Sequence, residues 1–410
     1  MATLHPFRAL RPKPADAAKI AAVPYDVVNT DEARALADGN PLSFLRVSRA
    51  EIELPPDTDP YAGVVYDRAK ANFETLCRRA LVVEDDPSVY FYRLRMGDHT
   101  QTGLAACFSI EEYDRDVIRK HERTRRDKED DRTRHMLALG AQTGPVFLTY
   151  RAAPEVNAIA ERSTRGAPLF DFEAEDGVRH TIWRVGGADR DALVAAFATI
   201  PALYIADGHH RAASAARARS EMRDTSVRAQ PLGDGADAST MLAVAFPHDQ
   251  VQILPYNRVV KDLGGLSPEA YMKAVRERFD VGSGPATPAR RGEIAMYVGG
   301  AWYTLRARTP PDDSDPIGSL DVSLLQEQLL APVLKIADVR TDKRIDFVGG
   351  ARGSGELRKL VDSGKAAVAF SLHPVSVSDL MQVSDAGAIM PPKSTWFEPK
   401  LRDGLLIHLI

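Results

Sequence analysis

The sequence predicts a mixed α/β (α+β) fold. Short apolar runs of strand type recur along the chain, and amphipathic or alanine-rich segments of helical type lie between them. The chain has 410 residues, of which 44% are hydrophobic, so it is long enough to bury a large core or to form two domains. Strands and helices do not alternate regularly enough for a barrel, and no repeat of roughly 20–50 residues indicates a solenoid. We therefore expect a sheet covered by several helices.

The expected strands are rich in β-branched and aromatic residues. They are Ser88–Arg95, Gly103–Ile110, Pro145–Tyr150, His180–Val185, Leu203–Ala206, Met241–Phe246, Ile294–Val298, Trp302–Arg306 and Ala366–Leu372. The expected helices show helical periodicity or good helix formers. They are Thr30–Ala37, Ala62–Arg79, Asp189–Phe197, Arg211–Met222, Pro268–Arg278, Val322–Leu330 and Val375–Val383. A further short strand is expected to end near Arg46 and Val47.

Loop signals divide the chain. Small residues and prolines gather at Arg228–Ser239 and Gly282–Gly292, which are expected surface loops or joints. Phe347–Gly350 is expected to be an apolar turn, and Met390–Lys400 is expected to be a loop, because its prolines exclude a regular helix. We expect a catalytic region at residues 1–255 that contains a charged insertion, followed by a C-terminal α/β region at residues 256–410.

The composition excludes several classes of protein. The chain has 53 basic and 57 acidic side chains, so no large cationic field for nucleic acid is expected. Cys77 and Cys107 are the only cysteines and lack metal-ligand spacing, which argues against a disulfide framework or a structural zinc. No segment has the apolar length of a signal peptide or a membrane span. A cytoplasmic location, with no membrane partner, is therefore expected.

The most informative segment is Asp207–Arg211, which joins a buried strand to an alanine-rich helix within five residues. Asp207 is suited to cap the helix, and Gly208 permits a tight bend or the close approach of a ligand. His209, His210 and Arg211 would then add potential cations to a helix end that already carries positive potential. A bound anion would relieve this repulsion, since phosphate accepts from amides, imidazoles and guanidinium groups. The segment therefore predicts a phosphate site.

Two other interpretations of the segment remain. In the first, Asp207 only caps the helix, and the histidines bond to the backbone or to other carboxylates. In the second, His209 and His210 bind a metal ion, which requires their side chains to converge, although no HExxH spacing is present.

A second candidate segment is the charged run Ile118–Arg134. Opposite charges three and four residues apart are typical of a solvated helix face. His121 and Glu122 stand at its apolar start, where Glu122 could serve as a general base or a metal ligand, and Arg123 and Arg132 could hold phosphate. Glu51, after the predicted strand near Val47, is the other candidate catalytic carboxylate.

Several ordered motifs resemble one bacterial and archaeal family, the domain-of-unknown-function family 1015. The motifs that carry the resemblance are His5–Ala9, Pro24–Val27, His121–Glu122, Asp131–Arg132, Asp207–Arg211, Leu254–Arg258, Thr341–Arg344, Phe347–Gly350 and Met390–Lys400. They cover nearly the whole chain. The family was defined by sequence rather than by reaction, so this resemblance implies no activity.

A narrower resemblance is more informative about chemistry. Asp207–Arg211 is similar to the nucleotide-phosphate motif of the free-serine kinases, whose core is related to the ParB/sulfiredoxin-like fold. The likeness implies such a core with large insertions, phosphate contacts at the helix start, and a separate glutamate as base. The catalytic cysteine of sulfiredoxin is replaced here by Gly208-His209, and neither a ParB arginine pair nor a helix-turn-helix is present.

Together these features predict a small-molecule kinase that uses ADP or ATP with Mg²⁺ and phosphorylates a hydroxyl such as that of free serine. Gly208, His209, His210 and Arg211 would contact phosphates, with His121, Arg123 or Arg132 near them. Asp207 would cap the helix or bind Mg²⁺, and Glu51 or Glu122 would act as the base. No Walker-type phosphate loop occurs. The alternatives are a nucleotide-binding regulator without turnover and a metal-dependent hydrolase using His121, His209 and His210.

Overall fold

The computed structural model describes residues 1–224, 237–309, 312 and 314–410. The chain forms two compact units, Met1–Val251 with Pro399–Ile410, and Gln252–Glu398. The first unit thus takes in the last residues of the chain, which the expected single boundary near residue 255 does not anticipate. Each unit is described by itself.

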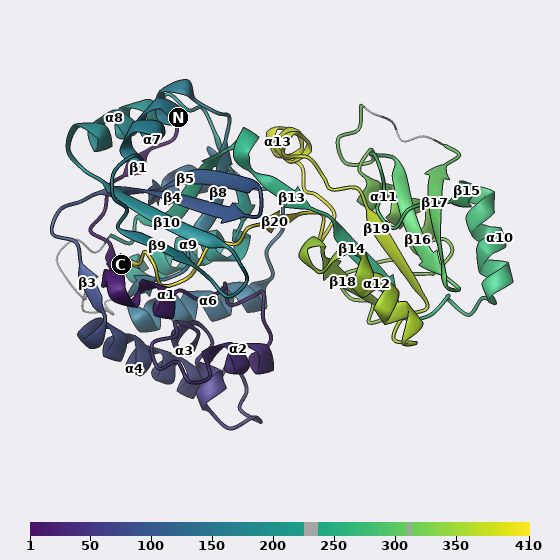
Figure 1. Cartoon of the computed structure of the whole chain (residues 1–410), viewed down its shortest axis with the longest axis horizontal. Helices are drawn as coiled ribbons and strands as arrows, with labels where there is room; N and C mark the ends of the chain where they lie inside the picture. Colours follow the sequence, from purple (N-terminus) through teal and green to yellow (C-terminus); the bar gives the residue numbers. More distant parts are fainter. Residues whose placement is uncertain (225–236, 310–311, 313) are drawn as a thin grey trace. The chain divides into compact units, whose positions relative to one another are not determined.

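A nine-stranded mixed sheet forms the centre of the first unit, in the order β6-β11-β8-β12-β5-β4-β10-β9, with β1 also paired to β5 (Figure 1). The neighbours β6 and β11, and β8 and β12, are parallel, and the other pairs are antiparallel. The strands of this sheet are β1 (Leu4–His5), β4 (Val89–Met96), β5 (His99–Ser109), β6 (Ile118–Arg119), β8 (Val146–Tyr150), β9 (Phe170–Glu173), β10 (Arg179–Val185), β11 (Leu203–Asp207) and β12 (Thr240–Pro247). Two small antiparallel pairs join β2 (Leu10–Pro12) to β3 (Leu81–Val83) and β7 (Ala141–Gln142) to β21 (His408–Leu409).

Among the described residues, five helices of this unit contribute buried residues to one large core that they share with the sheet. The helices of the unit are α1 (Ala17–Ile20), α2 (Thr30–Ala37), α3 (Leu45–Ser48), α4 (Gly63–Arg79), α5 (Ile110–Asp114), α6 (Arg126–Leu139), α7 (Pro154–Ser163), α8 (Gly187–Phe197) and α9 (His209–Asp224), with 3-10 turns at Pro14–Asp16, Ala50–Glu53 and His248–Gln250. Alternate residues of β5 (Leu104, Ala106, Phe108) pack into a core that also contains buried residues of α7, α8 and α9. This alternation is what a strand requires when one face covers a core.

A second core in the same unit is mainly helical. It joins buried residues of α2, α3 and α4, which lie together in Figure 1, to the start of β7 and the end of the chain. Local sequence accounts for some helix ends. The Asn29 side chain accepts a hydrogen bond from the Glu32 amide, and the Glu32 carboxylate accepts one from the Asn29 amide, so a capping box begins α2. Gly140, at φ 61°, ends α6 in the left-handed conformation.

The second unit contains a six-stranded sheet, β15-β17-β16-β19-β14-β18, in which every pair is antiparallel. Its strands are β14 (Tyr256–Val260), β15 (Phe279–Ser283), β16 (Glu293–Val298), β17 (Ala301–Ala307), β18 (Ile345–Gly349) and β19 (Val368–Leu372), and β13 (Gln252–Leu254) pairs separately with β20 (Trp396–Glu398). Its helices are α10 (Pro268–Arg278), α11 (Asp321–Leu325), a π-helical turn at Gln326–Leu330, a 3-10 turn at Gly350–Arg352, α12 (Gly353–Asp362) and α13 (Val377–Asp385).

The mixed α/β class is confirmed, and each strand and helix expected in the main list overlaps an observed element of the same type. Three local expectations are wrong. The segment expected as a strand near Val47 is helix α3, the apolar turn at Phe347–Gly350 belongs largely to β18, and the proline-rich loop contains strand β20. Pairing with β14 and β13 decides the last two, and such pairing partners are not visible in a local pattern. Most of the expected loop at Arg228–Ser239 lies outside the described residues.

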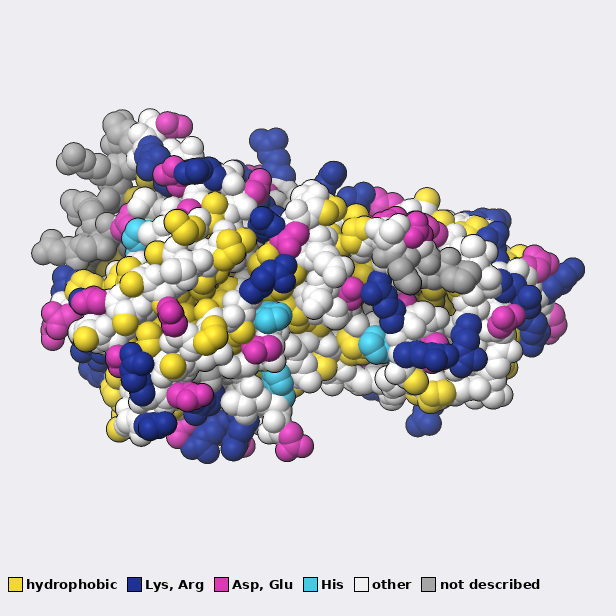
Figure 2. All heavy atoms as spheres, turned by 90° about the horizontal axis from the view of Figure 1, so that it is seen from above, with side chains coloured by type: hydrophobic (Ala, Val, Ile, Leu, Met, Phe, Trp, Pro, Cys, Tyr) yellow, Lys and Arg dark blue, Asp and Glu magenta, His cyan; other side chains and the backbone are white. Residues whose placement is uncertain are grey.

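The surface agrees with the balanced composition. On the face drawn in Figure 2, Lys and Arg side chains are interspersed with Asp and Glu side chains and form no broad field of one sign. Among the described residues, no helix has the length and apolar character needed to cross a bilayer.

Candidate functional site

The Asp207–Arg211 segment lies at one edge of the sheet in the first unit. Because β6 and β11 are parallel neighbours, the residues that follow each strand leave the sheet at the same edge. Asp207 is the last residue of β11, Gly208 adopts φ 92°, and α9 begins at His209. The strand, glycine and helix predicted here are therefore present. The helix begins one residue later than a cap at Asp207 requires.

Asp207 is held by cations and by the backbone. Its Oδ1 accepts from the Gly208 amide at 2.8 Å, and its Oδ2 accepts from Lys400 Nζ at 3.1 Å. The Arg211 guanidinium lies 3.9 Å from the same Oδ2. Burial by itself raises the pKa of this carboxyl, but the charges of Lys400 and Arg211 outweigh that effect and hold the pKa well below its usual range. Asp207 is therefore a carboxylate, and it serves as an ion-pair partner rather than as the expected helix cap.

Gly208 and Arg211 are packed against each other. A Cβ atom at position 208 would lie 3.2 Å from Arg211 Nε and 3.4 Å from the Cα of Val146. Arg211 is 6% exposed and donates from NH1 to the carbonyl of Pro145. Its Nε has no hydrogen-bond partner among the residues that the structure describes. The missing side chain at Gly208 thus lets the Arg211 guanidinium pack directly against the backbone.

The two histidines of the turn are neutral. Burial lowers the pKa of His210, and burial together with the neighbouring His121 lowers that of His209 well below its usual value. His210 Nε2 accepts a hydrogen bond from the Arg125 amide at 3.1 Å. The expectation that His209, His210 and Arg211 repel one another as three cations is therefore wrong. Of the three expected cations only Arg211 is charged, and the Asp207 carboxylate lies 3.9 Å from it, so the turn does not need a bound anion to be stable.

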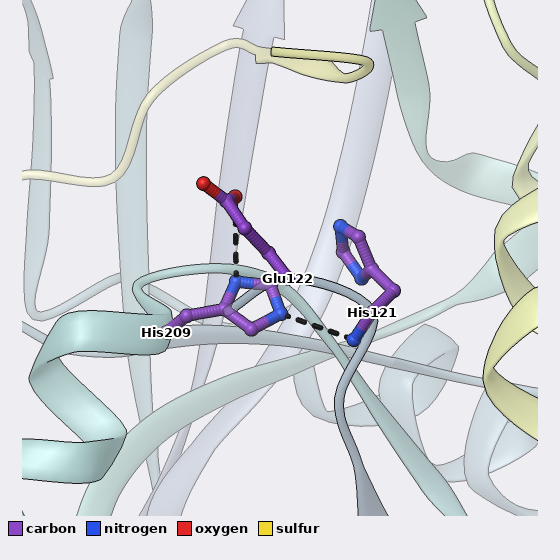
Figure 3. A group of neighbouring side chains, drawn as sticks. All are labelled: His121, Glu122 and His209. Carbon is purple, nitrogen blue, oxygen red and sulfur yellow. Dashed lines mark hydrogen bonds and ion pairs between the residues drawn. The ribbon is translucent and has the colours of Figure 1, made fainter. Parts of the chain in front are cut away.

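His121 and Glu122 join the turn from the segment after β6, as Figure 3 shows. The His121 amide approaches His209 Nε2 at 3.4 Å, and the two imidazole rings lie perpendicular with centroids 4.4 Å apart. The Glu122 carboxylate lies 4.0 Å from His209 Nδ1, and its side chain is 41% exposed. His121, Glu122 and His209 each offer one ligand atom within 4.8 Å of the others, the spacing of a possible metal site.

The two candidate arginines of the charged run differ in environment. Arg123 is exposed. Arg132 is nearly buried, pairs with Asp131 at 2.7 Å, and lies over the ring of Tyr25 at 4.1 Å. Asp131 also accepts from the hydroxyl of Tyr66 at 2.9 Å. These contacts indicate that Arg132 stabilises the fold by packing between Asp131 and Tyr25. The charged run Ile118–Arg134 is helical only from Arg126 onward, in α6. It is less solvated than expected, because α6 buries the polar side chains of Asp131 and Thr133.

Glu51 lies in the 3-10 turn after α3 and is 7% exposed. Its carboxylate pairs with Arg49 Nε at 2.8 Å, and Arg49 also donates to the carbonyl of Tyr25 and to the hydroxyl of Thr30. The structure thus gives Glu51 an ion-pair partner of its own, whereas Glu122 lies beside His209.

Sequence reasoning missed two residues of the C-terminal segment. The ammonium group of Lys400 is the nearest cation to the Asp207 carboxylate. Asp403 is 3% exposed, and its Oδ1 has no hydrogen-bond partner in the described part of the chain. Burial raises the pKa of Asp403 to about 7, against the opposing charge of Arg211. Neither residue lies in a recognisable catalytic motif, so only the return of the chain to the first unit brings them to the site.

A family model described as "Protein of unknown function (DUF1015)" matches residues 4–323. The chain belongs to the DUF1015 family. This match confirms the resemblance that the ordered motifs indicate. A comparison with curated proteins found no match.

Three solved structures are distantly similar to this DUF1015 protein. They are a free serine kinase in complex with AMP (12% identity, TM-score 0.36, 73% of this chain and 91% of that chain), SbnI with a C-terminal truncation from Staphylococcus aureus (12%, 0.40, 74% and 87%), and a conserved hypothetical protein from Pyrococcus furiosus (12%, 0.36, 74% and 95%). These distant likenesses leave the function to be inferred from the geometry of the site.

Proposed function

We propose that this DUF1015 protein is a small-molecule kinase that transfers a phosphoryl group from ADP or ATP, with Mg²⁺, to a hydroxyl such as that of free serine. The proposal includes a ParB/sulfiredoxin-like core in the first unit, with residues 1–255 as the catalytic region. The observation that carries it is the buried Arg211 Nε, which lies beside Gly208 at the start of α9 without a hydrogen-bond partner in the described residues.

The start of α9 supports phosphate binding. The amides of His209, His210 and Arg211 belong to the first helical turn, whose N–H groups have no partner within the helix. Such amides and the helix dipole together favour an anion. A phosphate oxygen at the start of α9 could accept from these amides and from Arg211 Nε, whose guanidinium packs against Gly208. Lys400 and Arg211 would add positive charge, while His210, whose Nε2 accepts the Arg125 amide, would donate from Nδ1 as a neutral imidazole.

Glu122 is the better placed of the two candidate bases. Its partly exposed carboxylate stands next to His209, where a small acceptor can reach it from solvent. Glu51 is buried and paired with Arg49. In the proposed reaction Glu122 accepts the proton of the acceptor hydroxyl while the site holds that hydroxyl in line with the phosphate.

The bound nucleotide would supply the transferable phosphoryl group, and Mg²⁺ would be held chiefly by its phosphates and by water. Asp207 fits a direct Mg²⁺ ligand less well than a positioning role, because both of its oxygens already accept hydrogen bonds from Gly208 and Lys400. The carboxylate would orient Lys400 and Arg211 toward the phosphate.

The direct test incubates the purified chain with ADP or ATP, Mg²⁺ and pooled amino acids, and looks for a phosphorylated product by mass spectrometry. Phosphoserine, or another phosphorylated hydroxyl compound, is the expected product. If the chain binds nucleotide but forms no phosphorylated product, the kinase proposal fails and the protein is a nucleotide-binding regulator. A chain that binds neither nucleotide would contradict the phosphate site itself.

Arg211→Lys tests the carrying observation, because lysine keeps the charge and loses the Nε donor. We expect nucleotide affinity to fall roughly 10-fold to 100-fold, the value of a charge-assisted hydrogen bond. The matched control is Arg217→Lys on the same helix, since Arg217 pairs with Asp130 and Glu129. Equal affinity in the two variants would remove Arg211 from the site.

Glu122→Gln tests the base. We expect the rate of product formation to fall about 100-fold or more while nucleotide affinity is kept. Glu51→Gln, verified as folded by circular dichroism, is the comparison and should leave the rate near that of the unaltered chain. The reverse pattern would assign the base to Glu51.

A further inference from the structure

We propose that His121, Glu122 and His209 bind one divalent transition-metal ion. The three residues come from two segments that follow parallel neighbouring strands, so the sheet itself brings them to one edge. Figure 3 shows the Glu122 carboxylate and the His121 ring on the same side of His209. The site stands independently of phosphoryl transfer, because it requires no nucleotide.

The unsatisfied nitrogens of His121 are the first argument. This side chain is 2% exposed, and neither Nδ1 nor Nε2 meets hydrogen-bond geometry with any described residue. Buried polar groups are nearly always bonded, and an ion is one of the few explanations for an exception. The equally buried His135 shows the ordinary arrangement, since its Nε2 lies 3.0 Å from the carbonyl of Val47. The backbone of Ile205 approaches the His121 ring but does not give it a hydrogen bond of that geometry.

The spacing of His209 and Glu122 is the second argument. The distance of 4.0 Å from His209 Nδ1 to Glu122 Oε2 is too long for a hydrogen bond. A metal ion about 2.0–2.2 Å from each atom fits between them. One ligand atom of each of the three residues lies within 4.8 Å of the others, and rotation of the partly exposed Glu122 side chain would bring its carboxylate closer to the two imidazoles.

The chemistry of the donors selects the ion. Two imidazoles and one carboxylate suit Zn²⁺, Mn²⁺, Fe²⁺ or Co²⁺, whereas Mg²⁺ and Ca²⁺ prefer oxygen ligands. Three protein ligands leave further coordination positions for water or a ligand oxygen. If Glu122 binds the ion through one carboxylate oxygen, its other oxygen can still accept a hydrogen bond.

The structure also changes the composition of the expected metal cluster. His210, which was considered together with His121 and His209, instead accepts the amide of Arg125 through Nε2. Glu122 takes its place beside the two remaining histidines. The site therefore combines one oxygen and two nitrogen ligands.

The test titrates Co²⁺ into the full chain after treatment with a chelator and follows visible d–d absorption and heat of binding, without nucleotide. We expect one Co²⁺ per chain and its displacement by Zn²⁺. His209→Gln and Glu122→Gln should weaken binding by at least about 100-fold, since even outer-shell changes cost 10-fold to 100-fold. His248→Gln, whose imidazole accepts the amide of Ala152, is the control and should keep the affinity.

Folding is checked by near-ultraviolet circular dichroism. Glu122→Gln provides the test if His209→Gln does not fold, because the Glu122 side chain is 41% exposed. The site would be supported if the unaltered chain and His248→Gln bind one Co²⁺ per chain and the other two variants do not. Absence of Co²⁺ and Zn²⁺ binding in the unaltered chain, or unchanged binding in Glu122→Gln, would overturn it. A chain that binds Co²⁺ but forms no phosphorylated product would contradict the kinase and leave the metal site intact.

Discussion

At the scale of single residues, Gly208 shows most clearly why the turn between β11 and α9 has its composition. Its φ of 92° lies in a region that side chains strain to adopt, and its missing Cβ lets Arg211 Nε and the backbone of Val146 approach. Two separate constraints thus select glycine here. A substitution should show both effects.

We expect Gly208→Ala to lower the free energy of unfolding by about 2–3 kcal/mol, from backbone strain of roughly 1 kcal/mol or more and from displacement of Arg211. Gly177→Ala is the matched control, because Gly177 has φ 76° with nothing within 4 Å of an added Cβ. Urea denaturation of both variants measures the difference. Equal losses would show that the contact with Arg211 has no energetic weight.

Lys400 is the second residue whose role follows from a single contact. Lys400→Met should destabilise the chain by about 2–4 kcal/mol, because it removes a partner from the buried Asp207 carboxylate. The depressed pKa of Asp207 contributes stability that is present above the unfolded pKa and lost in acid, so the loss on substitution should shrink as the pH falls. Lys261→Met, which removes an exposed pair with Asp346, should cost less than about 1 kcal/mol. Denaturation at pH 7 and pH 3 compares the variants.

At the scale of elements, the structure shows how strand direction assembles the site. The parallel pairing of β6 with β11 places two loops at one edge of the sheet, and α9 begins in one of them. The alanine-rich sequence after Arg211 is a good helix former, and buried Ala212 and Ala215 let α9 pack closely against the sheet. The start of α11 likewise determines the position of a charged group, because its first residue, Asp321, is buried there.

Asp321 begins α11, is 5% exposed, and accepts from the Gly292 amide at 2.8 Å. Burial raises its pKa to about 6. The folded state therefore binds the proton more strongly than the unfolded state, so stability should fall as the pH rises from about 4 to 6. Asp321→Asn should remove this decline and be more stable at pH 7 by on the order of 2–3 kcal/mol. Thermal unfolding across this pH range tests it, and parallel curves for the two proteins would contradict it.

At the scale of the whole molecule, the second unit is an insertion in the sequence of the first. Gln252 and Glu398 are paired across β13 and β20, so the two crossing points of the chain lie next to each other. The second unit also has its own sheet, with a core that contains Val259, Leu357 and Ala369. An insertion with adjacent ends can be removed without pulling its host apart.

We expect a chain in which a short glycine-serine linker joins Val251 to Pro399 to fold cooperatively, and residues 252–398 to fold as a separate protein. Circular dichroism and urea denaturation of both pieces measure this. The matched comparison is a chain truncated after Val251, which loses Lys400 and the buried residues Leu401–Ile410 and should be markedly less stable. A linked chain that fails to fold would show that the first unit depends on the second.

The sequence by itself determined the mixed α/β class, the principal strands and helices, the family, and the strand-glycine-helix turn at Asp207–Arg211. These follow from apolar periodicity and from residues with narrow conformational roles. The tertiary structure alone decided which residues accompany the turn. Burial made the histidines neutral, and the parallel strands placed Glu122 beside His209. Protonation and pairing depend on neighbours distant in the chain, and Lys400 lies 193 positions from Asp207.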